Sequence, residues 1–124
     1  MKALLLAAAL LAAAAFIPGA APAAAQSFDC AKAAKPDEKA VCADAALGNL
    51  DTKMATLWWV VEQVPMMMGA RGAARDDQQA FLKTRAACGA DTACLTKAYD
   101  ARIAALQAQV KDQMQQYCKA IQLC

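Results

Sequence analysis

The chain has 124 residues, carries a formal net charge of +2 and contains no histidine. The small net charge argues against a nucleic-acid-binding protein and against an acidic protein that attracts a basic partner electrostatically. The absence of histidine removes the commonest general base and the commonest zinc ligand. Hydrophobic residues make up 60% of the chain, a value raised by an alanine-rich apolar segment at its start.

That first segment has the three parts of a secretory signal peptide. Lys2 supplies a positive charge, residues 3–17 are uncharged and apolar, and small residues with an A-x-A cleavage pattern occupy 20–25. We therefore expect a signal peptide over 1–25, with the mature chain starting at Gln26 in the periplasm or outside the cell. The alternative is a retained membrane anchor, for which the run is short because a spanning helix needs roughly 20 apolar residues.

All six cysteines lie in the expected mature domain, residues 26–124. An even number of cysteines in an exported chain indicates three disulfides. A lipid-anchored form is rejected, because polar residues rather than small apolar ones precede the first cysteine. Six cysteines allow 15 connectivities, and the close spacings favour local pairs that would each contribute roughly 2–3 kcal/mol. The favoured pairs are Cys30–Cys42, Cys88–Cys94 and Cys118–Cys124.

Helix-forming residues dominate the mature domain, and Val, Ile and Thr are sparse. A short helix is expected over 36–43, with a proline at its first position and with Asp37 and Glu38 complementing the helix dipole. Asp44 then caps a second helix that Pro65 ends. Its apolar positions recur at steps of three and four residues; they are Leu47, Leu50, Met54, Leu57, Val61 and Val64.

Residues 65–74 are expected to form a loop, because they include a proline and two glycines. A third helix should start within 75–77 and run to about Ala87. The residues of this helix that are expected to face the core are Phe81, Leu82 and Ala86.

A helix break is expected around Gly89, which suits a C-terminal cap, and Asp91 suits the next N-cap. The break matters because Cys88 and Cys94 would lie about 9 Å apart along a continuous helix, too far for a disulfide. The last helix is expected over 92–121. Its apolar stripe comprises Leu95, Tyr99, Ile103, Leu106, Val110, Met114, Tyr117 and Ile121.

Two features are candidates for contact with a partner protein. Adjacent helical side chains point about 100° apart, so the second tryptophan of Trp58-Trp59 leans outward and is a possible binding anchor; packing against a neighbouring helix is the favoured alternative. Three consecutive methionines suit an adaptable binding surface, with local packing and copper binding through thioethers as alternatives. The partner-binding candidates are Trp59, Met66, Met67, Met68 and Arg71.

No combination of residues indicates an enzyme. The mature domain has one serine, Ser27, its cysteines are expected to be oxidised, and it has no glycine-rich phosphate loop. Asp76 and Asp77 are adjacent on a helix start and point in different directions, so they do not form a carboxylate pair. We therefore expect a protein without catalytic residues, metal site or cofactor.

Four of the cysteines stand within a wider pattern of residues. The pattern consists of Phe28-Asp29-Cys30, Glu38-Lys39-Ala40-Val41-Cys42-Ala43-Asp44, Leu47, Leu50-Asp51, Phe81-Leu82, Arg85, Cys88, Cys94-Leu95 and Tyr99-Asp100-Ala101-Arg102-Ile103-Ala104-Ala105-Leu106. It resembles the LprI-type lysozyme-inhibitor domain of exported bacterial proteins. The resemblance spans about 28–106 and leaves 107–124 as a C-terminal extension. It implies a small helical exported domain and, for the founding type, inhibition of lysozyme.

The predicted fold is all-α, a small disulfide-stapled helical hairpin or bundle of three to four helices. Its long helices, about 45–64 and 92–121, should pack their apolar stripes together, with the third helix covering one side. The resemblance implies that the protein binds a lysozyme or related muramidase and blocks its cleft. The alternative is a periplasmic envelope or stress interaction module without inhibitory activity. No nucleic acid partner and, after signal cleavage, no membrane association are expected.

Overall fold

The computed structural model describes residues 26–122, and every regular element within them is a helix. A single 3-10 turn, η1 (Cys30–Lys32), precedes four α-helices. These are α1 (Pro36–Ala43), α2 (Ala45–Gln63), α3 (Met68–Cys88) and α4 (Thr92–Ala120). The all-α prediction is confirmed. The expected signal peptide and Cys124 lie outside the described residues.

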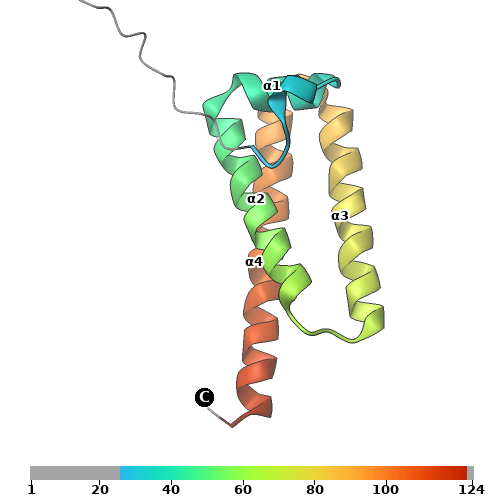
Figure 1. The fold of residues 1–124 in the computed structure, drawn as a ribbon, viewed down its shortest axis with the longest axis vertical. Helices are drawn as coiled ribbons and strands as arrows, with labels where there is room; N and C mark the ends of the chain where they lie inside the picture. The colour runs from blue at the N-terminus through green and yellow to red at the C-terminus, as the bar shows by residue number, and fades with distance from the viewer. Residues whose placement is uncertain (1–25, 123–124) are drawn as a thin grey trace, which may run out of the picture.

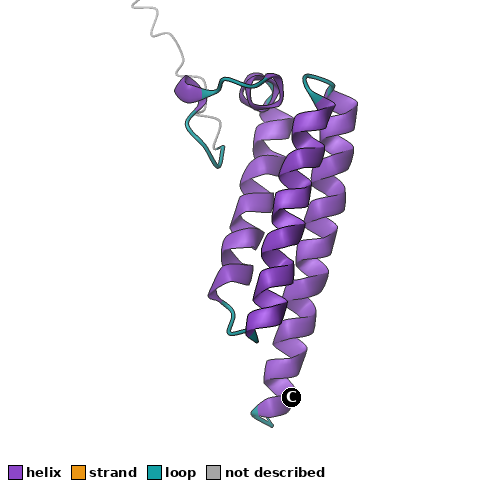
Figure 2. Cartoon of the chain, turned by 90° about the vertical axis from the view of Figure 1, so that its right-hand side faces the viewer, coloured by secondary structure: helices purple, strands orange, loops and turns teal. Residues whose placement is uncertain are grey.

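The three long helices form a bundle, and α1 crosses one of its ends (Figure 1). α2 and α4 run in the same direction and α3 runs between their ends in the opposite direction. The predicted packing of the second helix on the last one is therefore a parallel contact, and α3 makes the two antiparallel hairpins. α4 is the longest helix and projects beyond the loop that joins α2 to α3 (Figure 2).

The helix boundaries follow from capping residues that the sequence singled out. Asp44 accepts hydrogen bonds from the backbone N–H groups of Ala46 and Leu47 at 2.8 and 3.2 Å, and so starts α2. Asp91 starts α4 in the same way. Gly89 ends α3 with a φ of +56°, a conformation that glycine adopts without strain.

The core lies between α2 and α4, with α1 and α3 completing it. The edge of the Phe81 ring packs on Tyr99, with 5.3 Å between the ring centroids. Each large apolar side chain that is fully buried contributes roughly 1.5–3 kcal/mol. The buried apolar residues are Val41, Leu47, Met54, Val61, Ala74, Phe81, Leu95, Tyr99, Ile103 and Leu106. Leu50, Leu57, Leu82 and Val110 are partly buried against them.

Two predictions about the third helix are wrong. Residues 68–74 are helical rather than a loop. Gly69 and Gly72 each cost about 1 kcal/mol in a helix, but the alanines between and after them favour it, and Ala74 is buried in the core. Ala86 is exposed, and the inward position near it belongs to Arg85.

The apolar stripe of α4 is covered over only part of its length. Its residues are buried as far as Leu106, whereas Met114, Tyr117 and Ile121 are exposed. α2 and α3 have 19 and 21 residues and α4 has 29, so the last turns of α4 have no neighbouring helix to cover them.

Candidate partner-binding surface

Two disulfides close the end of the bundle where α1 lies, which we call the disulfide end. Cys30–Cys42 joins η1 to α1, and Cys88–Cys94 spans the turn between α3 and α4. Both predicted pairs are confirmed. Cys118 is oxidised too, but its expected partner lies outside the described residues. Disulfides of this kind indicate an oxidising compartment outside the cytoplasm. Within residues 26–122, no helix has the length and hydropathy to cross a membrane.

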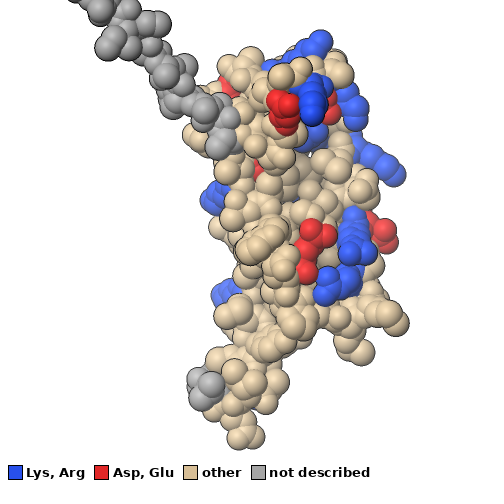
Figure 3. Space-filling model, viewed as in Figure 1, with Lys and Arg blue, Asp and Glu red and all other residues tan. Residues whose placement is uncertain are grey.

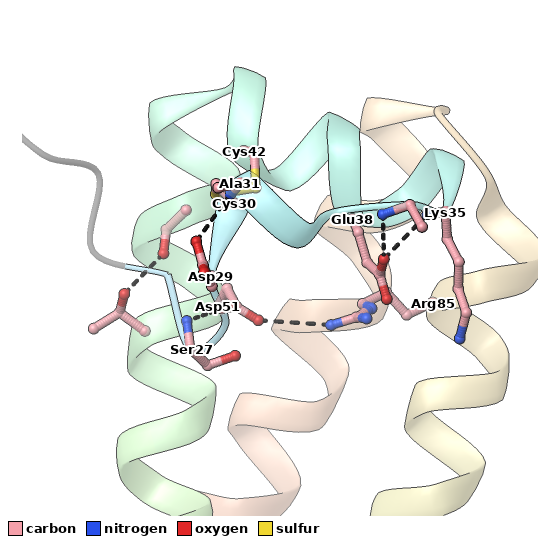
Figure 4. The surroundings of a disulfide bond; sticks show 12 residues. Ser27, Asp29, Cys30, Ala31, Lys35, Glu38, Cys42, Asp51 and Arg85 are labelled. Carbon is pink, nitrogen blue, oxygen red and sulfur yellow. Dashed lines mark hydrogen bonds and ion pairs between the residues drawn. A yellow bond between two sulfur atoms is a disulfide. The ribbon is translucent and has the colours of Figure 1, made fainter.

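A network of buried charges lies directly beneath the disulfide end. The Arg85 Nε donates to Asp37 Oδ2 at 2.9 Å, and its Nη1 lies 3.8 Å from Asp51 Oδ1. The Tyr99 hydroxyl donates to the same Asp51 oxygen at 2.9 Å. The backbone N–H of Ser27 donates to the other oxygen, Oδ2, at 2.6 Å (Figure 4). Asp51 therefore ties together three separate segments of the chain.

Burial sets the protonation states of this network. Burial raises the pKa of Tyr99, and the neighbouring Asp51 carboxylate raises it further, so the phenol stays neutral at neutral pH. Burial lowers the pKa of Arg85, but Tyr99 and Asp37 raise it by more, and the net shift is upward. Since Tyr99 is neutral at neutral pH, the charge of Arg85 is compensated there by the carboxylates of Asp37 and Asp51.

Sequence reasoning missed this network. It assigned Asp37 to the helix dipole, whereas the side chain points inward to Arg85. The signal that could have revealed it is the position of Asp51, which lies on the same helix face as the apolar residues Leu47 and Met54. A carboxylate inside an apolar stripe is buried and needs a partner.

Large apolar side chains remain uncovered at the opposite end, which we call the methionine end. Its exposed residues come from the start of α3 and from the projecting turns of α4. Met67 and Met68 are 85% and 91% exposed, whereas Met66 is half-buried. On the face shown in Figure 3, no charged side chain lies on the projecting tip. The exposed large apolar residues of this end are Met67, Met68, Met114, Tyr117 and Ile121.

Trp59 lines a different hollow from the one lined by Met66 and Met67. It is 61% exposed and is not packed against the core, so it leans outward as the helical angle predicts, contrary to the favoured alternative of packing against a neighbouring helix. It lines a shallow hollow on the outer side of α2 with Ser27 and Thr56. Trp58 is half-buried and lies 5.8 Å from the Arg102 guanidinium, measured to its ring centroid. The hollow that Trp59 lines therefore does not include the exposed methionines.

Arg71 is engaged within the turn between α2 and α3. Its Nη1 donates to the carbonyl of Glu62 at 3.1 Å and its Nη2 to that of Val64 at 3.3 Å. Carbonyls at a helix C-terminus lack partners within the helix, so Arg71 stabilises the end of α2. Its contact with a partner protein stays a prediction.

The described residues give no support to a metal centre. Across 26–122, no group of three or more Cys, Asp or Glu side chains lies close enough to hold a metal ion. The exposed thioethers of Met67 and Met68 have no such group beside them.

Comparison of the chain with protein-family models, with curated proteins and with solved structures finds no match. The resemblance to the LprI type thus depends on the residues quoted above. Three of these residues, Asp51, Arg85 and Tyr99, are buried in the charged network. The resemblance therefore concerns the interior of the fold more than its surface.

Proposed function

We propose that this protein is an exported, non-catalytic binding protein that inhibits a lysozyme or related muramidase by occupying its cleft. The observation that carries the binding part of the proposal is the methionine end, where Met67, Met68, Met114, Tyr117 and Ile121 are exposed together at one end of the bundle. The muramidase comes from the resemblance to the LprI type.

Exposed apolar side chains gathered at one place are a feature of interaction sites on soluble proteins. Methionine is suited to such sites, because its unbranched thioether adapts to the shape of a partner. The projecting part of α4 is a single helix, about 10–12 Å across with its side chains. That width suits insertion between the walls of a cleft better than a flat face would.

The helical scaffold supports the proposal, because Met68, Met114 and Tyr117 lie on helices that are already formed. A binding surface that is ordered before it meets its partner loses less conformational entropy on binding. The small net charge means that long-range attraction contributes little, and contact is driven by apolar burial. We therefore expect inhibition to change little when salt is raised from low to physiological concentration.

The test is a cell-wall lysis assay with animal, goose-type, invertebrate-type and bacterial muramidases. The full chain is expressed, exported and purified with its disulfides intact. We expect a dose-dependent loss of lysis that saturates near one inhibitor per enzyme for at least one class. The double variant Met67→Gln/Met68→Gln should weaken inhibition at least tenfold, and the exposed control Gln79→Ala should leave it unchanged.

If correctly oxidised protein inhibits no muramidase, the inhibitor proposal is rejected. The alternative of a periplasmic envelope interaction module without inhibitory activity would then be the function to test. If inhibition is present but the methionine variant is unaffected, the inhibitory surface lies elsewhere.

A further inference from the structure

A groove of about 600 Å³ runs between α3 and α4. Arg102 lies at one end of it and Gln116 at the other, a distance of about 21 Å along α4. Its floor on α4 includes Ala105 and Ala108, and small side chains at these positions leave the space open. Met67, with Pro65 and Met66, forms the wall beside the methionine end.

Arg102 is a buried cation without a carboxylate partner. It is only 8% exposed. Its Nε donates to the neutral amide oxygen of Gln78 at 3.0 Å, and its buried Nη2 has no hydrogen-bond partner. No ion pair with a carboxylate forms at Arg102 within the described residues. Burial lowers the pKa of Arg102, because no nearby anion offsets the cost of burying its charge fully.

The comparison with Arg85 shows what is missing. Arg85 is equally buried, but it faces the carboxylates of Asp37 and Asp51. A buried guanidinium without an anionic partner is costly. Arg102 has only the Trp58 ring, Gln78 and the more distant charge of Asp77 around it.

A second residue of the groove holds an unpartnered buried polar atom. Gln113 Oε1 is buried and accepts no hydrogen bond. It lies eleven residues after Arg102, or about 16 Å along the helix. Five residues of extended chain span about that distance. The groove therefore offers a donor cation at one end and an acceptor of an N–H group further along.

We propose that the groove binds an extended peptide segment of a partner protein, which places an Asp or Glu side chain on Arg102 and a backbone N–H on Gln113. A singly charged carboxylate fits better than a phosphate, because Asp77 and Asp112 also line the groove and would repel a dianion. Guanidinium and carboxylate form strong, paired hydrogen bonds. This inference rests on the proposed function in one respect, namely that the partner is a protein.

The carboxylate belongs to a side chain rather than to a chain end, because the trough continues past Arg102. A second hollow of about 370 Å³ shares Asp77, Arg102 and Ala105 with the groove and extends toward Phe81 and Ala98. A bound segment can therefore run on beyond its acidic residue.

The test titrates the isotope-labelled, oxidised protein with three peptides and follows the Arg102 Nε–H and Gln113 side-chain NMR signals. The probes are Ac-Ala-Gly-Ala-Ala-Gly-Glu-Ala-Ala-NH2, its Gln counterpart, and Ac-Ala-Gly-Ala-Ala-Gly-OH. We expect the Glu peptide to bind at least tenfold more tightly than the other two, and to shift both signals. Equal binding of the Glu and Gln peptides would overturn the proposal, and equal binding of the third peptide would overturn the side-chain assignment.

Variants make the result independent of folding defects. Arg102→Gln should abolish the preference for Glu. Because that change also removes contacts with Gln78 and Trp58, the exposed Asp77→Asn is the safer variant, and it should tighten binding of the Glu peptide about twofold to fivefold, the size of one exposed charge interaction. If Asp77→Asn instead weakens binding, Asp77 is the internal partner of Arg102 and the proposal fails. If the native protein inhibits a muramidase but binds none of the peptides, the groove proposal alone is rejected. If it binds the Glu peptide but inhibits no muramidase, the proposed function alone is rejected.

Discussion

The disulfide end and the methionine end of the bundle differ in how their side chains are buried and paired. At the disulfide end, two disulfides and the Asp37–Arg85–Asp51 network hold α1, α2, α3 and α4 together. At the methionine end, α4 projects alone, carries the oxidised Cys118, and exposes large apolar residues. The difference is that the buried charges and their ion pairs are concentrated at one end, whereas large apolar side chains are left exposed at the other.

Among the variants that test this comparison, Arg85→Met should change stability most. The change leaves the buried carboxylates of Asp37 and Asp51 without their cation, which should lower the free energy of unfolding by about 3–5 kcal/mol. Urea unfolding followed by circular dichroism measures it. The control is Arg75→Met, an exposed arginine of the same helix, which should change stability by less than about 0.5 kcal/mol. A loss below about 1 kcal/mol for Arg85→Met would mean that the network does not stabilise this end.

Removal of the disulfides should have the next largest effect. Replacing Cys30 and Cys42 together by alanine opens a loop with a sequence separation of 12 and should cost about 3 kcal/mol. Replacing Cys88 and Cys94 by alanine opens a shorter loop, with a sequence separation of 6, and should lower the free energy of unfolding by about 2 kcal/mol. Hydrogen exchange should show faster opening at the disulfide end in both variants and little change in the last turns of α4. Faster exchange confined to those turns would contradict the comparison.

Tyr99→Phe should have a smaller effect at neutral pH, about 1.5 kcal/mol, because one hydrogen bond to the charged Asp51 is lost. The pH dependence carries more information. The pKa of Tyr99 is raised in the folded state, so the folded protein holds this proton more tightly than the unfolded chain does. Its contribution is present below about pH 10 and is lost as pH rises above that value.

Thermal unfolding measured from pH 8 to 11 therefore tests the network. The native protein should lose stability above about pH 10, and Tyr99→Phe should flatten that decline. Tyr117 is exposed, so Tyr117→Phe should keep the decline of the native protein. An unchanged slope in Tyr99→Phe would show that other groups cause it.

Much of the fold could be predicted from local signals. Asp44, Asp91 and Gly89 mark helix boundaries through their own backbone contacts, and the disulfide spacings favoured local pairs that the structure contains. The start of α3 could not be found in this way, because Gly69 and Gly72 locally favour a loop. Burial of Ala74 and the contact of Arg71 with α2 are tertiary effects that outweigh this preference.

The candidate site was less accessible to sequence reasoning. The outward direction of Trp59 follows from the helical angle alone. The exposure of Tyr117 and Ile121 does not, because it depends on where α2 and α3 end relative to α4. The groove at Arg102 is harder still to predict from the sequence. The spacing between two helices decides whether a buried guanidinium meets a carboxylate, and local patterns do not give that spacing.

The smallest effect on stability is expected at the methionine end. The double variant Met67→Gln/Met68→Gln changes two almost fully exposed side chains, so the free energy of unfolding should stay within about 0.5 kcal/mol of the native value. The urea midpoint and the slope of the transition measure this directly. A loss above about 1 kcal/mol would mean that the methionines pack against the protein in solution and that the two ends are alike. An unchanged stability together with weaker inhibition would show that these side chains serve contact with a partner, because folding would not have needed them.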